Sequence, residues 1–148
     1  MRSGLILGAQ SWTPEVDLKM VPNFLLEEIV VRQDGAGLPI DLGETRPEFL
    51  NLTLGITRII EQESLDLSIW ASADGENWGE KPVVAFPQKF YCGVYTLLVD
   101  LTRHPDAKYL RAQWKVNRWG RGEQKPLFGI YLFAQVADVP VYALRATA

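Results

Sequence analysis

Residues 109–118, YLRAQWKVNR, carry the clearest secondary-structure signal in the chain. Leu110, Ala112, Trp114 and Val116 alternate there with polar residues. A two-residue period places successive side chains on opposite faces of a strand, so that one face packs in the core and the other meets water. The stretch therefore predicts a strand of an antiparallel sheet, with Trp114 on the core side.

The same alternation recurs in residues 65–72, LDLSIWAS, where it places Trp70 on the polar face near Asp66. Residues 49–60 form a third predicted strand, which we expect to pair with residues 65–72 as a hairpin because only EQES separates them. Further strands are predicted at residues 83–86, 94–101, 128–136 and 141–145. Residues 94–101 and 128–136 are apolar on both faces, which predicts central strands or strands covered by loops.

Seven or eight short strands joined by polar turns predict an all-β protein, an antiparallel β-sandwich of the jelly-roll type. Residues 22–32 fit either a strand or a helical turn, so at most one short helix is expected near the N-terminus. Four segments dense in turn residues are predicted loops: 34–47, 73–82, 102–108 and 117–126. We expect one β-sandwich domain over residues 1–148.

The composition is ordinary for a soluble globular protein, with 47% hydrophobic and 22% charged residues. A formal net charge of -3 lacks the basic surplus typical of nucleic-acid binders. The opening MRSGLILGAQSW holds too short an apolar patch for a secretion signal or a membrane span. We therefore expect a cytoplasmic protein with neither a nucleic-acid nor a membrane partner.

Residues suited to catalysis or metal binding are sparse. One cysteine and one histidine cannot supply a zinc site, and a nucleophilic Cys92 would need His104 as its base. A thiol packed as a small hydrophobe is the favoured interpretation of Cys92. Asp34, Asp41 and Glu44 leave a calcium loop open as the alternative to a solvated acidic loop. We expect no enzyme activity, no cofactor and no metal, and a hydrolase is the least favoured alternative.

Three stretches, LDLSIWASADGENWG, VDLTRHPDAKYLRAQWKV and FGIYLFAQV, follow one another in an order that resembles the discoidin-like family. These β-sandwiches are also called coagulation factor type C or galactose-binding-like domains, and the resemblance covers residues 50–136. It implies a non-catalytic binding module, with carbohydrate as the leading ligand. In that family the Asp-Gly turn fixes a loop, which implies that Trp78 braces the turn. The architecture also serves lipid, protein and structural roles.

Trp119 is the leading candidate for an exposed ligand-binding ring. It follows a predicted strand and lies between Arg118 and Arg121, and an indole among polar donors suits a sugar ring or an acidic partner. The alternative is a ring folded back over the end of the sandwich. Three further residues, Trp78, Asn77 and His104, complete the candidate ligand-binding set.

Trp70 and Arg111 are the candidate protein-interface residues, because Trp and Arg are enriched at the hot spots of interfaces. The doubly apolar stretches at 94–101 and 128–136 also predict more hydrophobic surface than one sandwich covers. The alternative function is therefore a structural or interaction protein that acts as a homo-oligomer without a small-molecule ligand.

Overall fold

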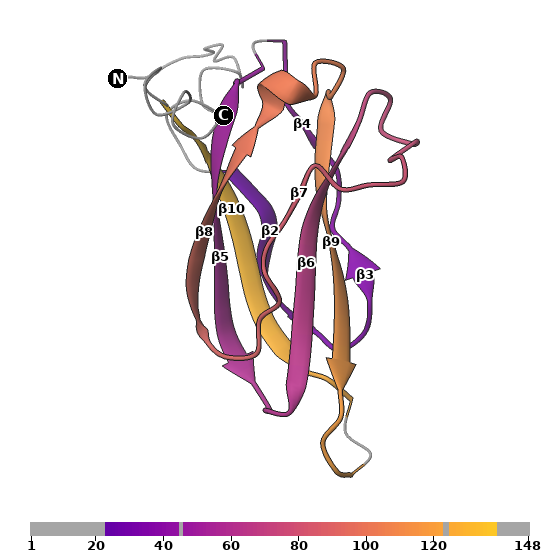
Figure 1. Ribbon diagram of the computed structural model, residues 1–148, viewed down its shortest axis with the longest axis vertical. Helices are drawn as coiled ribbons and strands as arrows, with labels where there is room; N and C mark the ends of the chain where they lie inside the picture. Colours follow the sequence, from indigo (N-terminus) through magenta and orange to yellow (C-terminus); the bar gives the residue numbers. More distant parts are fainter. Residues whose placement is uncertain (1–22, 45, 123–124, 139–148) are drawn as a thin grey trace, which may run out of the picture.

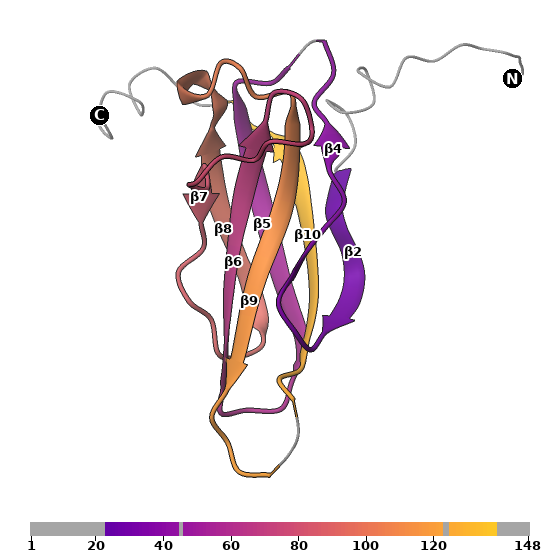
Figure 2. The ribbon, with the colours of Figure 1, turned by 90° about the vertical axis from the view of Figure 1, so that its right-hand side faces the viewer.

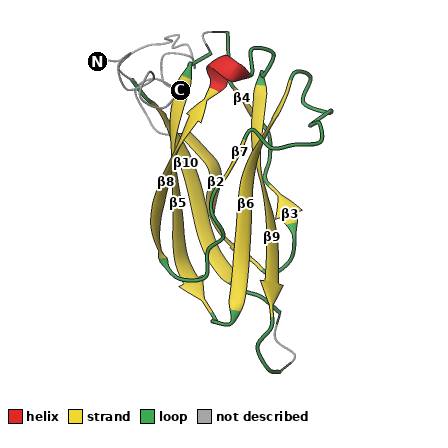
Figure 3. Ribbon diagram, viewed as in Figure 1, coloured by secondary structure: helices red, strands yellow, loops and turns green. Residues whose placement is uncertain are grey.

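The computed structural model describes residues 23–44, 46–122 and 125–138. Two antiparallel sheets pack face to face, and Figure 1 shows them edge-on as two layers. The prediction of an all-β antiparallel β-sandwich is confirmed. Within the described ranges the chain forms no α-helix, only the short 3-10 helix η1 (Leu101–Arg103), drawn in red in Figure 3. No helix in these ranges is long and apolar enough to cross a membrane.

The first layer is a four-stranded sheet with the order β2-β10-β5-β8. Its strands are β2 (Asn23–Val31), β10 (Phe128–Val136), β5 (Phe49–Ile59) and β8 (Gly93–Asp100). Pairing of β2 with β10 decides the open choice for residues 22–32 in favour of a strand. Strand β10 is central, as predicted. Strand β8 lies at the edge and leaves Val94 and Leu98 exposed, so the expectation of a central or covered strand is wrong there.

The second layer is a five-stranded sheet in which β3, β9, β6 and β7 follow in order and β4 also pairs with β9. Its strands are β3 (Gly35–Ala36), β4 (Ile40–Asp41), β6 (Glu63–Ser72), β7 (Val84–Ala85) and β9 (Tyr109–Arg118). Figure 2 looks onto the outer face of this sheet. Strands β3 and β4 fall within the predicted loop 34–47, because two-residue strands are too short to show alternation. The strand predicted at residues 141–145 lies outside the described residues.

The predicted hairpin between β5 and β6 is wrong, because these consecutive strands belong to different sheets. Both edges of β5 are occupied, one by β10 and the other by β8. Glu61 and Gln62, with φ of 59° and 56°, turn the chain from one sheet to the other. The inward leucines of β5 and β6 consequently belong to opposite walls of one core instead of neighbouring positions in one sheet.

Leucine and isoleucine side chains from both sheets fill the space between the layers. The most deeply buried include Leu52, Leu54, Leu65, Leu67, Ile69, Leu110, Ile130 and Leu132. Trp114 is buried among them, as its alternation predicts, and its indole Nε1 donates to the backbone oxygen of Gln33 at 3.0 Å. That hydrogen bond satisfies the polar atom of the ring, so the indole can fill core volume without an unpaired donor.

A buried carboxylate joins the two sheets at one end of the sandwich. Glu63, the first residue of β6, is only 1% exposed. Its Oε2 accepts from the backbone nitrogen of Ile60 at 3.0 Å, directly after β5, and its Oε1 accepts from that of Leu127 at 2.7 Å, directly before β10. One side chain in the five-stranded sheet therefore binds the ends of two strands in the four-stranded sheet.

Gly55 makes room for an aromatic ring on the outer face of the four-stranded sheet. It pairs with Tyr131, and a Cβ added at Gly55 would come within 2.0 Å of the Tyr131 ring. The ring also stacks on Phe133, with centroids 6.1 Å apart. A glycine at the centre of a strand normally weakens it, so here the close approach of the ring explains its place.

We predict that Gly55→Ala destabilises the protein by about 1–3 kcal/mol, the usual cost of overpacking. In a Tyr131→Ala background the same substitution should cost much less, because the ring that occupies the space is gone. Urea unfolding of the four proteins in this double-mutant cycle measures the coupling. An equal cost in both backgrounds would show that the Tyr131 ring is not the constraint on Gly55.

We predict that Glu63→Gln lowers the free energy of unfolding by about 1–3 kcal/mol, because the amide brings an NH2 group against one of two backbone donors. Urea unfolding at pH 7 measures the change. The matched control is Glu61→Gln, two residues away and exposed, for which we expect a change within about 0.5 kcal/mol. Similar losses for the two variants would contradict a special role for Glu63.

Candidate functional site

A groove of about 540 Å³ lies on the outer face of the five-stranded sheet. Strands β6 and β9 form its floor, with the side chains that alternate away from the core. Their register places Asp66 opposite Lys115, Ser68 opposite Gln113 and Trp70 opposite Arg111. Asp34 and Gly35 line the groove on the β3 side, and Ala85 and Phe86 line it on the β7 side.

Hydrogen bonds hold several of the polar groups that line this groove. The Trp70 Nε1 donates to Ser68 Oγ at 2.9 Å, and Gln88 Nε2 donates to Asp66 Oδ2 at 3.0 Å. Asp34 Oδ1 accepts from the backbone nitrogen of Val116 at 2.9 Å. The donors and acceptors are therefore pre-positioned by local contacts, which lowers the entropic cost of binding a polar ligand.

A stacked tryptophan and arginine lie beside one end of the groove. The Arg111 guanidinium carbon lies 4.4 Å from the centroid of the Trp78 ring, in the geometry of a cation–π contact. With the Gln113 amide turned to satisfy its hydrogen bonds, its oxygen accepts from Arg111 Nε at 3.2 Å and from Nη2 at 3.0 Å. Arg111 is the cross-strand neighbour of Trp70, so the two predicted interface residues and Trp78 meet in one place.

The Asp-Gly turn that carries Trp78 is tightly hydrogen-bonded. Asp74 Oδ1 accepts from the backbone nitrogens of Glu76 and Asn77, each at 2.9 Å, and from the Ser72 hydroxyl at 2.9 Å. These hydrogen bonds, that from Asn77 above all, lower the pKa of Asp74 to about 2. Gly75 supplies the positive φ of 82° that the turn requires. The ring of Trp78 contacts Arg111 of β9, and its bracing role stays a prediction.

Trp119 lies away from this groove, at the end of the sandwich where the loop after β9 begins. Its side chain is 57% exposed and meets Phe90 edge-on, with ring centroids 6.2 Å apart. Tyr91, 64% exposed, follows Phe90 at 6.3 Å. Arg118 Nη1 donates to the backbone oxygen of Arg121 at 3.2 Å. The three predicted residues are thus together, and Trp119 is more than half exposed while its ring packs against Phe90.

The remaining predicted ligand residues lie elsewhere. Asn77 is part of the Asp-Gly turn, where its Oδ1 accepts from the backbone nitrogen of Gly79 at 3.1 Å. His104 follows η1 at the opposite end of the sandwich from Trp119, in a cavity of about 310 Å³ that Arg103, Pro105 and Asp106 also line. The six candidates therefore belong to three separate places, and no single ligand of ordinary size contacts all of them.

Sequence reasoning missed Phe90, which stands in the stretch QKFYCG between β7 and β8. Two adjacent aromatic residues in a connecting segment are a signal for exposed rings, but only the fold brings that segment to Trp119.

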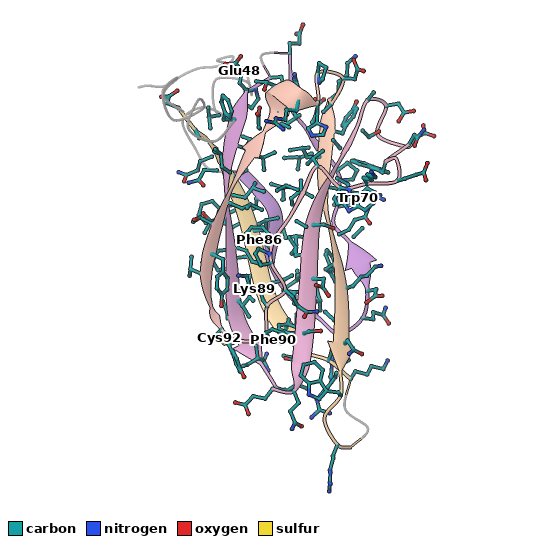
Figure 4. All side chains as sticks on the ribbon, in the orientation of Figure 1. Glu48, Trp70, Phe86, Lys89, Phe90 and Cys92 are labelled. Atoms are coloured by element: carbon teal, nitrogen blue, oxygen red, sulfur yellow. The ribbon has the colours of Figure 1, made fainter. Side chains whose placement is uncertain are left out.

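The packed thiol expected for Cys92 is wrong, because the residue is exposed beside these rings (Figure 4). Strand β8 lies between Cys92 and His104, so the suggested nucleophile and its base are separated by about 26 Å of strand.

Acidic and sulfur groups are dispersed in the part of the chain that the structure describes. No three of its His, Cys, Asp or Glu side chains gather in a way that could hold a metal ion. Two of the three acids of the suggested calcium loop accept hydrogen bonds from the backbone: Asp34 Oδ1 accepts from the nitrogen of Val116 at 2.9 Å, and Asp41 Oδ1 accepts from that of Gly43 at 2.8 Å.

The lowered pKa of Asp74 predicts a pH dependence of stability. Its pKa falls from 3.8 to about 2 on folding, so its contribution is complete above pH 3.8 and is lost as the pH falls toward 2. The loss in free energy of unfolding caused by Asp74→Ala should therefore shrink between pH 5 and pH 2.5. Urea unfolding at each pH measures it. The control is Glu76→Gln, because only the backbone nitrogen of residue 76, and not its side chain, bonds to Asp74. An effect of Asp74→Ala that does not change with pH would contradict the assignment.

Comparison with known proteins leaves these geometric features as the basis for function. No protein-family model matches the chain, and no protein of curated function is similar to it. What stands of the discoidin-like resemblance is the two-sheet antiparallel β-sandwich.

Proposed function

We propose that this protein is a non-catalytic binding module that holds a carbohydrate in the groove on the outer face of the five-stranded sheet. One observation carries the proposal. Trp70 lines an open groove on one face of the sheet together with polar side chains, both uncharged and charged. Trp70 lies at the side of the sandwich, well apart from Phe90 at its end (Figure 4). The proposal assigns the carbohydrate to the groove and treats the Trp119 loop as a separate candidate site.

The chemistry of the groove suits a sugar ring. A pyranose offers an apolar face to an indole and hydroxyl groups to donors and acceptors. Trp70 supplies the ring, while Ser68 and Gln113 supply groups that can both donate and accept. Asp66 and Lys115 lie opposite each other further along the groove and add a charged acceptor and a charged donor. Open grooves bury little of their ligand, so a modest affinity is expected.

The absence of catalysis is part of the proposal. A carboxyl group that acts as general acid near neutral pH needs a raised pKa. Hydrogen bonds instead lower the pKa of Asp74 and of Asp100, the latter chiefly through the Thr102 hydroxyl. Both carboxyls serve as caps for backbone nitrogens, which supports a structural role for each.

The strand order supports the finer, jelly-roll part of the fold prediction. If β3 and β4 count as one interrupted strand, the sheets read β2-β10-β5-β8 and β3/β4-β9-β6-β7. The chain then changes sheet at every connection except that between β6 and β7, as expected of two interlocked Greek keys. A galactose-binding-like relationship is compatible with this order and belongs to the proposal. The cytoplasmic location and the lack of nucleic-acid or membrane partners stay predictions from the sequence.

A glycan array followed by calorimetric titration of the best glycan tests the proposal. We expect binding by the wild type and a loss of roughly tenfold or more in affinity for Trp70→Ala, equivalent to about 1.4 kcal/mol. Trp119→Ala is the matched control, because it removes an exposed indole at the other candidate site. Urea unfolding verifies that Trp70→Ala is folded.

Three results are decisive. Loss of binding in Trp70→Ala alone supports the groove. Loss in Trp119→Ala alone moves the carbohydrate site to the Phe90–Trp119 loop end. No glycan-dependent signal from the folded wild type overturns the carbohydrate proposal and favours the alternative of a structural or interaction protein.

A further inference from the structure

A row of four residues crosses the five-stranded sheet in the middle of the groove, between Trp70 and Asp66. The register of the strands places the four side by side on the outer face, on β3, β9, β6 and β7 in turn: Ala36, Gln113, Ser68 and Ala85. Figure 2 shows the two long strands of this row, β9 and β6, next to each other on the side that faces the viewer. Two polar side chains therefore lie between two methyl groups.

Arg111 determines which end of the Gln113 amide is available to a ligand. The Nε and Nη2 atoms of Arg111 donate to the amide oxygen at 3.2 and 3.0 Å, with the amide turned to satisfy these hydrogen bonds. The same guanidinium lies over the Trp78 ring, with its carbon 4.4 Å from the ring centroid. Because Arg111 engages the oxygen, Gln113 presents its NH2 group to the groove, and that group can only donate.

Ser68 supplies a second donor beside Gln113. Its Oγ accepts from Trp70 Nε1 at 2.9 Å, and the hydroxyl group can still donate its own proton. The same hydrogen bond holds the edge of the indole next to Ser68. Two donors therefore lie together beside an aromatic ring, where one oxygen atom with two lone pairs, such as a carbonyl oxygen, can accept from both.

Ala85 adds an apolar surface next to these donors. It pairs with Ser68 on the side away from Gln113, and it is exposed and lines the groove. An acetyl group offers the matching features, because its carbonyl oxygen and its methyl group are bonded to one carbon. With that carbon over Ser68, the oxygen lies toward Gln113 and the methyl group toward Ala85. Outward residues two positions apart on a strand are separated by about 7 Å, so a sugar ring stacked on Trp70 brings its substituent to this row.

The charges of the groove disfavour a charged substituent at this place. Among the described residues that line it, Asp34 and Asp66 are acidic and Lys115 alone is basic. An acidic sugar is therefore repelled on balance. A free ammonium group brings further N–H donors against the NH2 group of Gln113 and leaves that group without an acceptor. An uncharged carbonyl group avoids both conflicts.

We propose that the ligand of the groove is an acetylated sugar and that Gln113 selects it. The inference rests on the proposed carbohydrate function and adds the class of sugar. The sugar ring stacks on Trp70, the acetyl oxygen accepts from Gln113 and Ser68, and the acetyl methyl group packs on Ala85. Arg111 is a positioning residue, because it acts on the ligand only through the amide that it orients.

Calorimetric titration with pairs of oligosaccharides that differ only in acetylation tests the class of ligand. Chitin oligosaccharides are paired with cellulose oligosaccharides of equal length, N-acetyllactosamine with lactose, and O-acetylated xylan fragments with the same fragments after removal of their esters. We expect the acetylated member of at least one pair to bind more tightly by roughly tenfold or more. The first two pairs carry the acetyl group as an amide and the third as an ester, so they separate its two sources.

Gln113→Glu tests the selecting residue. The carboxylate can still accept from Arg111 but has no donor for the ligand, so affinity for the acetylated sugar should fall by roughly tenfold while that for its unacetylated partner changes little. Asn117→Asp is the matched control, because it makes the same change at an exposed position of β9 that does not line the groove. It should keep the wild-type preference. Arg111→Lys retains the charge but not the planar fork, and should lower the affinity ratio within the pair. Urea unfolding verifies that each variant is folded.

The possible failures are distinguishable. Equal affinities within every pair overturn the acetyl inference, and if this binding disappears in Trp70→Ala the carbohydrate groove still stands. Absence of binding to any sugar by the folded wild type overturns the acetyl inference and the carbohydrate function together. A Gln113→Glu variant that is folded and keeps the full preference for the acetylated member also overturns the inference.

Discussion

The hydrogen bonds of the Glu63 carboxylate give the sandwich a fixed relation between its two sheets. Apolar packing holds the layers together but is not directional, so it does not by itself set how one sheet lies on the other. Glu63 is buried between them and accepts from Ile60 and Leu127, which flank β5 and β10. Removing an acceptor from buried donors is expensive, so alternative alignments of the layers are disfavoured.

The position of Glu63 also decides which residues of β6 reach solvent. Because Glu63 points inward, the alternation that starts with it sends Leu65, Leu67 and Ile69 into the core. Asp66, Ser68 and Trp70 must then line the outer face, and the register with β9 supplies their partners. A shift of one residue would exchange the two sets. The groove is thus a consequence of the same register that builds the core.

Local periodicity in the sequence accounts for what could be predicted. The alternation of residues 109–118 and 65–72 correctly placed Trp114 inside and Trp70 outside, because side-chain direction in a strand is a local property. Which strands become neighbours is not local, and the predicted β5–β6 hairpin failed for that reason. The contact of Trp78 with Arg111 and that of Phe90 with Trp119 likewise join residues far apart in sequence. Arg118, Trp119 and Arg121 were found together because they are consecutive or nearly so.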